Sequence, residues 1–146
     1  MKNLIKIAFL TISPLFVFSC STSDDELDTE KPKIILGTPG DHEEFHFGDT
    51  IELQALLTDN VELGSYKIDI HTDADGHQHR TISTNWDYSD TGVLEGKKEY
   101  ILNKTIQIPE GDYKEGHYHL GLMVIDKAGN QTETYIEIVI GEDHHH

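Results

Sequence analysis

Histidines are the residues of this sequence whose type and number most clearly indicate chemistry. There are 10 of them, against 11 lysines and arginines together. Neutral imidazole binds zinc at about 2.0–2.1 Å and also suits copper and nickel. The zinc-binding motif His-Glu-x-x-His is absent, and a single exposed histidine is usually only solvated. A metal site therefore requires that the fold bring several of these histidines close together. The histidines are His42, His46, His71, His77, His79, His117, His119 and the terminal run His144–His146, which also resembles a tag remnant.

Alternating apolar residues predict that β-strands position these histidines. From Lys31 onward the alternation has a period of two, which is typical of half-buried strands, and helix signals are scarce. The stretch Thr81–Tyr100 is poorly patterned, and we expect a long excursion there with at most one edge strand. The other predicted strands are Pro32–Thr38, Thr50–Thr58, Leu63–His71, Ile101–Ile108, Gly116–Asp126 and Thr132–Ile140.

Seven short strands separated by turn signals favour an all-β Greek-key sandwich spanning residues 32–141. Two stretches, Asp59–Tyr66 and Asp126–Thr132, resemble the B–C and F–G connections of bacterial Ig-like and fibronectin-like repeats. Tyr118 stands near the start of strand F, where a tyrosine often forms a corner. The resemblance implies a seven-stranded Ig-like or fibronectin-like sandwich with strands A, B, C, C′, E, F and G and a long C–C′/E excursion.

This topology brings the histidines to one pole of the sandwich. The A–B, C–C′ and E–F connections share that pole, whereas the B–C and F–G connections share the other and carry no histidine. Strands C and F are neighbours about 4.8 Å apart. We therefore expect His71 and His119 to be cross-strand neighbours that point outward, with His117 on the same face about 6.6 Å along the strand. His77 and His79 follow strand C and are expected to fold over them.

These placements predict a divalent transition-metal site, for zinc or copper, built from histidines. The expected ligands are His71, His77, His79, His117 and His119, with His42 and His46 as second choices. Carboxylates commonly orient ligand imidazoles, and Asp73, Asp75, Glu43 and Glu44 are the candidates for that role. Asp73-Ala74-Asp75-Gly76 also resembles the start of a calcium loop. The EF-hand continuation is missing, so an acidic turn is the simpler interpretation and calcium is the less favoured metal.

The N-terminus has the features of an export signal, residues 1–19. Lys2 and Lys6 precede an apolar run that is shorter than the roughly 20 residues of a membrane span. The run ends at Val17-Phe18-Ser19-Cys20, which resembles a bacterial lipoprotein signal. That resemblance implies cleavage before Cys20, the only cysteine, and lipidation of its thiol. Residues 20–31 are small, polar and acidic, as expected of a flexible tether, and residues 142–146 form a His-rich tail.

The chain is similar to a family of Bacteroidetes surface lipoproteins, catalogued as domain of unknown function 4625. The similarity is carried by the lipidation motif with its acidic tether, by Leu63–His71 and by Asp75-Gly76-His77-Gln78-His79. It spans nearly the whole chain and implies an Ig-like fold and a lipoprotein of the outer membrane that is exposed on the cell surface. It implies no activity, so the function has to be argued from the residues.

Composition narrows the possible functions. The formal net charge of −16 leaves no basic surface for nucleic acid. The sequence contains neither a phosphate-binding loop nor a nucleophile elbow, so we expect that the protein is not an enzyme. The expected function is metal capture, buffering or delivery to an outer-membrane receptor or transporter. The alternative is a non-catalytic module that binds glycan or protein through Trp86 and Tyr88, which otherwise cover a sheet edge. The sequence does not indicate an oligomeric state.

Overall fold

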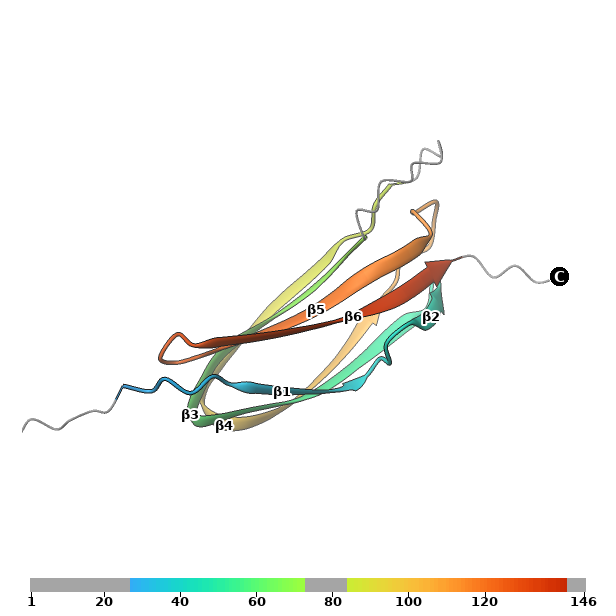
Figure 1. Ribbon diagram of the computed structural model, residues 1–146. Coiled ribbons are helices and arrows are strands. Elements are labelled where there is room, and N and C mark those ends of the chain that lie inside the picture. The colour runs from blue at the N-terminus through green and yellow to red at the C-terminus, as the bar shows by residue number, and fades with distance from the viewer. Residues whose placement is uncertain (1–26, 73–83, 142–146) are drawn as a thin grey trace, which may run out of the picture.

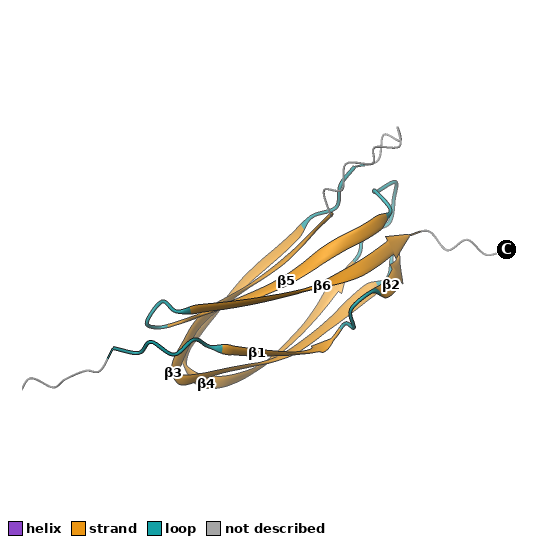
Figure 2. Cartoon of the chain, viewed as in Figure 1, coloured by secondary structure: helices purple, strands orange, loops and turns teal. Residues whose placement is uncertain are grey.

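The computed structural model describes residues 27–72 and 84–141, and every regular element in these ranges is a β-strand (Figure 2). No helix capable of crossing a bilayer occurs in that part of the chain. The strands are β1 (Lys33–Thr38), β2 (Glu43–His46), β3 (Thr50–Thr72), β4 (Tyr88–Gln107), β5 (Gly116–Asp126) and β6 (Gln131–Gly141).

One sheet curls over itself to make two layers (Figure 1). The first half of β3 pairs with β1 and with the second half of β4, whereas its second half pairs with β5 and with the first half of β4. The hairpin partner β6 continues the second layer beyond β5, and the short β2 adds to it in parallel. Both long strands bend where their register shifts, near residues 58–65 of β3.

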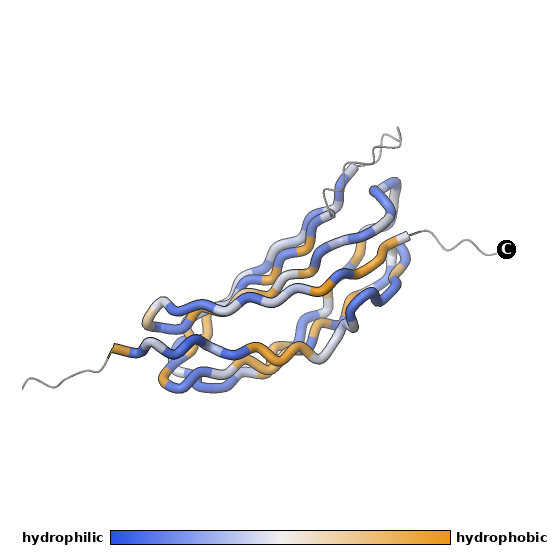
Figure 3. Tube along the Cα trace, viewed as in Figure 1, coloured by the Kyte–Doolittle hydropathy of each residue, from blue (hydrophilic) through white to orange (hydrophobic). Residues whose placement is uncertain are grey.

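The core lies between the two layers because apolar side chains alternate along each strand, a pattern visible in Figure 3. The inward residues of β3 include Ile51, Leu53 and Leu57 in its first half and Ile68 and Ile70 in its second. Tyr66 and Tyr118 are also buried as expected, while the intervening residues of β3 and β5 point outward. The inward faces predicted from the alternation of these strands are therefore confirmed.

The all-β prediction is confirmed, but the seven separate strands are not. The predicted strands Thr50–Thr58 and Leu63–His71 form one continuous strand, β3. The edge strand allowed within Thr81–Tyr100 is present over residues 88–100, but it runs without interruption into the next predicted strand as β4, so the second half of this stretch is not an excursion. Residues 43–46, predicted to be a connection, form β2. The described residues thus contain six strands.

Two aromatic residues close the core between β5 and the segment before β4. The Trp86 side chain is only 8% exposed, and its ring centroid lies 5.9 Å from that of Tyr118. The Tyr118 hydroxyl donates to the carbonyl of Lys114, four residues upstream, and burial raises its pKa to about 12. Trp86 is therefore a core residue, so it does not offer the exposed stacking platform that glycan binding through this segment would need.

Candidate metal centre

Three strands place His71, His119 and Glu137 in one row across the outer face of the second layer. His71 of β3 is the register partner of His119 of β5, and His119 is the partner of Glu137 of β6. The two imidazole rings meet edge to face with centroids 5.7 Å apart. The cross-strand contact expected from the sequence is thus present, and Glu137 extends the row by one strand.

Glu137 organises the neighbouring histidines. Its Oε1 lies 2.6 Å from Nδ1 of His117, which stands two residues before His119 on the same face of β5. The same oxygen lies 3.0 Å from Nε2 of His42, in the turn before β2. Because this carboxylate contacts Nδ1 of His117, the opposite ring nitrogen, Nε2, points away from Glu137.

Asp69 acts in the same way on His71. Its Oδ2 lies 2.9 Å from Nδ1 of His71, and its Oδ1 lies 3.0 Å from Nζ of Lys67. The bond from Lys67 and then that from His71 hold the pKa of Asp69 below its ordinary value, although partial burial opposes them. Asp69 therefore remains an anionic acceptor at neutral pH, and Nε2 of His71 makes no polar contact within the described part of the chain.

His42 is held by two carboxylates at once. Nδ1 is 3.0 Å from Oδ2 of Asp41 and Nε2 is 3.0 Å from Glu137, so both ring nitrogens are engaged. The backbone of His42 has φ of 61°, a left-handed conformation that non-glycine residues seldom adopt. A bond from the Glu137 backbone N–H holds the pKa of Asp41 below its ordinary value. His42 thus supports Glu137 and is a poorer ligand candidate than His71 or His117.

The remaining predicted residues lie apart from this row or outside the described ranges. His46 lies on β2, with Nδ1 3.4 Å from Oδ2 of Asp49. Glu43 accepts from the backbone N–H of Gly40 and closes a turn, whereas Asp69 contacts His71 and Glu137 contacts His117. The positions that lie outside the described residues are Cys20, Asp73, Asp75, His77, His79 and the tail 142–146.

The histidine row is not yet a closed coordination shell. In residues 27–72 and 84–141, three metal-binding side chains bring their ligand atoms within 4.8 Å of one another only at Asp28, Asp59 and Asp126. This second cluster lies at the opposite end of the strands and was not predicted from the sequence. The side chains of His71 and His117 are exposed and that of His119 is half-buried, and ligation by this group requires the rings to turn about their side-chain bonds.

Sequence reasoning missed Asp69 and Glu137 as partners of the histidines. Alternation along the strands already placed both on the outward face, and the β5–β6 hairpin determines which residue of β6 stands opposite His119. The length of the β5–β6 turn was therefore the sequence feature that could have predicted Glu137 as the partner of His119. A turn centred one residue differently would have put another side chain beside His119.

Comparisons with known proteins identify the family of this domain. The family model described as domain of unknown function DUF4625 matches residues 18–141. The chain belongs to this family. No curated protein matches the chain. Among solved structures, the DUF4625 chain is similar to the sporulation control protein Spo0M from Bacillus subtilis, with 12% identity and a TM-score of 0.43. The match covers 78% of this chain and 49% of that protein, so the chain spans about half the length of that structure.

Proposed function

We propose that this protein is a surface-anchored lipoprotein whose histidine face binds zinc or copper, for capture, buffering or delivery. The histidine face consists of the outward side chains of His71, His117 and His119 together with Asp69 and Glu137. One observation carries the proposal: Nδ1 of His71 and Nδ1 of His117 each contact a carboxylate. Ligand histidines in metal sites characteristically have this arrangement, because the carboxylate fixes the ring and increases the basicity of the other nitrogen.

The neighbouring chain offers further ligands for such a site. β3 ends at Thr72, one residue after His71, and the segment that follows contains His77 and His79. We expect one or both to complete a tetrahedral set with the face, because structural zinc sites usually have four protein ligands. A site with three protein ligands would leave a position for exchange, which suits capture and delivery.

The anchor is proposed from the sequence, and the Ig-like fold is proposed from the sequence and the packing. Lipidation of Cys20 would attach the chain to the outer membrane through the residues that precede β1, and an outer-membrane receptor or transporter is the expected partner. The bond from Tyr118 to Lys114 supports an Ig-like fold, because a tyrosine at the start of strand F makes this contact in Ig-like sandwiches. In this variant, strands B and C are continuous as β3, and strands C′ and E as β4.

The test of the metal site is the double substitution His71→Ala/His119→Ala. We expect the affinity of the full chain for zinc or copper, measured by titration calorimetry, to fall at least about tenfold, because the face loses two neighbouring ligands. The matched control is Gln54→Ala/Asn103→Ala, an exposed cross-strand pair in the other layer. Equal binding by the parent and the His71/His119 variant would place the metal site elsewhere.

The pH dependence of binding identifies the ligand type. Imidazole must be neutral to bind metal, and its ordinary pKa is about 6.5. Zinc binding by the parent chain should therefore be lost as the pH falls from about 7 to about 5. Binding that persists unchanged to pH 5 would show that carboxylates hold the ion.

A further inference from the structure

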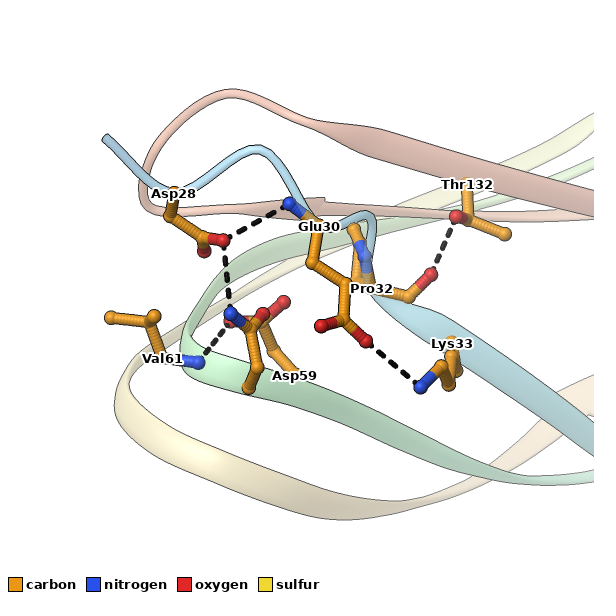
Figure 4. A network of polar contacts seen from close by, with 8 residues as sticks. Asp28, Glu30, Pro32, Lys33, Asp59, Val61 and Thr132 are labelled. Atoms are coloured by element: carbon orange, nitrogen blue, oxygen red, sulfur yellow. Dashed lines mark hydrogen bonds and ion pairs between the residues drawn. The ribbon is translucent and has the colours of Figure 1, made fainter. Parts of the chain in front are cut away.

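A second site lies at the opposite end of the strands, where three carboxylates from distant segments converge. Asp28 precedes β1, Asp59 lies at the bend of β3, and Asp126 ends β5. One carboxylate oxygen of each lies within 4.8 Å of the others. Figure 4 shows the Asp28 carboxylate directed toward the bend that carries Asp59.

The cluster is built into the fold and does not result from chance contacts of surface side chains. Asp126 is only 4% exposed, and its two oxygens accept from the backbone and the side-chain amide of Asn130. Gly64 permits the close approach of the bend to the end of β5, because a Cβ there would lie 2.8 Å from the carbonyl oxygen of Asp126. The β3 bend and the β5–β6 turn are thereby fixed against each other.

The Asp28 segment is fastened to the same end. Oδ1 of Asp28 accepts from Nδ2 of Asn60 at 3.0 Å, and its carbonyl accepts from Nδ2 of Asn130 at 3.1 Å. Further along the segment, the carbonyl of Pro32 accepts from the Thr132 hydroxyl at 2.5 Å. The chain that precedes β1 therefore crosses directly over the cluster.

One oxygen of the cluster has no partner. Oδ1 of Asp59 accepts from the backbone N–H groups of Val61 and Glu62, whereas Oδ2 is fully buried and makes no hydrogen bond with any described residue. Such an orphaned buried carboxylate oxygen is costly unless a donor or a cation meets it. Among the described residues, no lysine, arginine or histidine forms an ion pair with Asp28, Asp59 or Asp126.

We propose that Asp28, Asp59 and Asp126 bind a calcium ion that fixes the segment before β1 to this end of the domain. Calcium takes six to eight oxygen ligands at about 2.3–2.6 Å, so two ligands of one ion lie at most about 5.2 Å apart, which agrees with the observed spacing. The donors are all oxygens, with no nitrogen or sulfur among them, and this favours a hard cation over zinc or copper. The site is distinct from the Asp73–Asp75 sequence and from the histidine face.

Calcium titration of the full chain tests this proposal. We expect one calcium site and a melting temperature that rises with calcium concentration, since an ion that binds only the folded state stabilises it. Asp28→Asn and Asp59→Asn should each weaken binding at least tenfold. The matched control is Glu30→Gln, in the same segment but paired with Lys33 at 3.0 Å, and it should bind as the parent does.

Proteolysis shows whether the ion also fixes the segment. Calcium should slow cleavage after Glu30 by a glutamate-specific protease in the parent chain but not in Asp28→Asn. No binding by the parent at about 10 mM calcium, which is above the range typical of extracellular calcium modules, would overturn the proposal. So would undiminished binding by the Asp28→Asn/Asp59→Asn double variant, or cleavage that calcium does not slow.

Discussion

At the scale of single residues, Glu137 connects the histidine face with the turn before β2. It lies opposite His119, contacts His117 and His42 through one oxygen, and is joined by its backbone to Asp41 and His42. A carboxylate in this position orients the rings that it contacts, those of His117 and His42. The contribution that we expect Glu137 to make to the proposed metal binding is therefore indirect and separable from the stability of the strand.

The substitution Glu137→Gln tests this positioning role. We expect zinc affinity to fall about tenfold, because the neutral amide is a weaker acceptor for the imidazole N–H, while the melting temperature of the metal-free chain stays unchanged. Calorimetry and thermal unfolding of the same samples provide both values. Glu133→Gln is the control, since Glu133 lies on the same face of β6 four residues earlier. Similar affinities for the two variants would assign Glu137 no role in the metal site.

At the scale of the elements, the pairing of β3 with β4 depends on a glycine under an aromatic ring. Gly92 of β4 is the register partner of Tyr66, and a Cβ at Gly92 would lie 2.2 Å from Cε1 of that ring. The ring is buried, with the Lys104 ammonium 5.8 Å from its centroid. The tyrosine thus covers the backbone of the edge strand and takes the space that a side chain would occupy.

We expect Gly92→Ala to lower the free energy of unfolding by about 1–3 kcal/mol, because the added methyl group forces the ring or the strand to shift. Urea denaturation measures this change. Gly141→Ala on β6 is the matched control, because no atom lies within 4 Å of the Cβ it would add. The packing argument fails if the two variants unfold at the same urea concentration.

The fold was predictable wherever one face of a strand is buried. Ile68 and Ile70 alternate with Lys67 and Asp69, and the structure keeps that division. The extent of β4 escaped prediction because its first half lies at an edge. Residues there such as Glu95, Lys97 and Lys98 are exposed and polar, as in many edge strands. The short β2 depends on parallel pairing with β6, ninety-five residues away in the case of Glu43 and Ile138, which no local pattern encodes.

The two candidate sites also differ in how far the sequence alone could predict them. His71 and His119 were predictable as neighbours because adjacent strands carry them. The aspartate cluster was not, because it assembles a residue that the sequence assigns to the tether, a residue at a bend and a residue at a turn. Asp59 and Asp126 each begin a stretch that is typical of Ig-like connections, and those two connections share a pole. This shared pole was the one sequence feature that could have indicated that the two aspartates lie close together.

At the scale of the whole molecule, the two sites lie at opposite ends. The segment before β1 enters beside the β3 bend and the β5–β6 turn, while His71 and His117 lie at the other end of β3 and the beginning of β5 (Figure 1). If Cys20 is lipidated, as we propose, the histidine face points away from the membrane and the aspartate cluster lies next to it.

Thiol labelling of whole cells tests this orientation. A cysteine at Glu44, exposed on β2, should react faster with a bulky maleimide than a cysteine at Ala128, exposed in the β5–β6 turn, because the membrane shields the second position. Detergent-solubilised protein is the control, in which both positions should react alike. Equal rates on whole cells would remove the support for an outward histidine face, and faster reaction at Ala128 would reverse the orientation.

The entry of the chain at one pole also determines how the domain carries a mechanical load. If Cys20 is lipidated and the histidine face binds a ligand, as we propose, a pull on that ligand loads residues 27–32 along the axis of β1. Because β1 runs antiparallel to β3 from Lys33 to Thr38, this force is parallel to the strands and shears their hydrogen bonds together, whereas a sideways pull would open them one after another. If the protein is anchored on the cell surface as proposed, fluid drag would thus load the domain in a direction in which several hydrogen bonds must break at once.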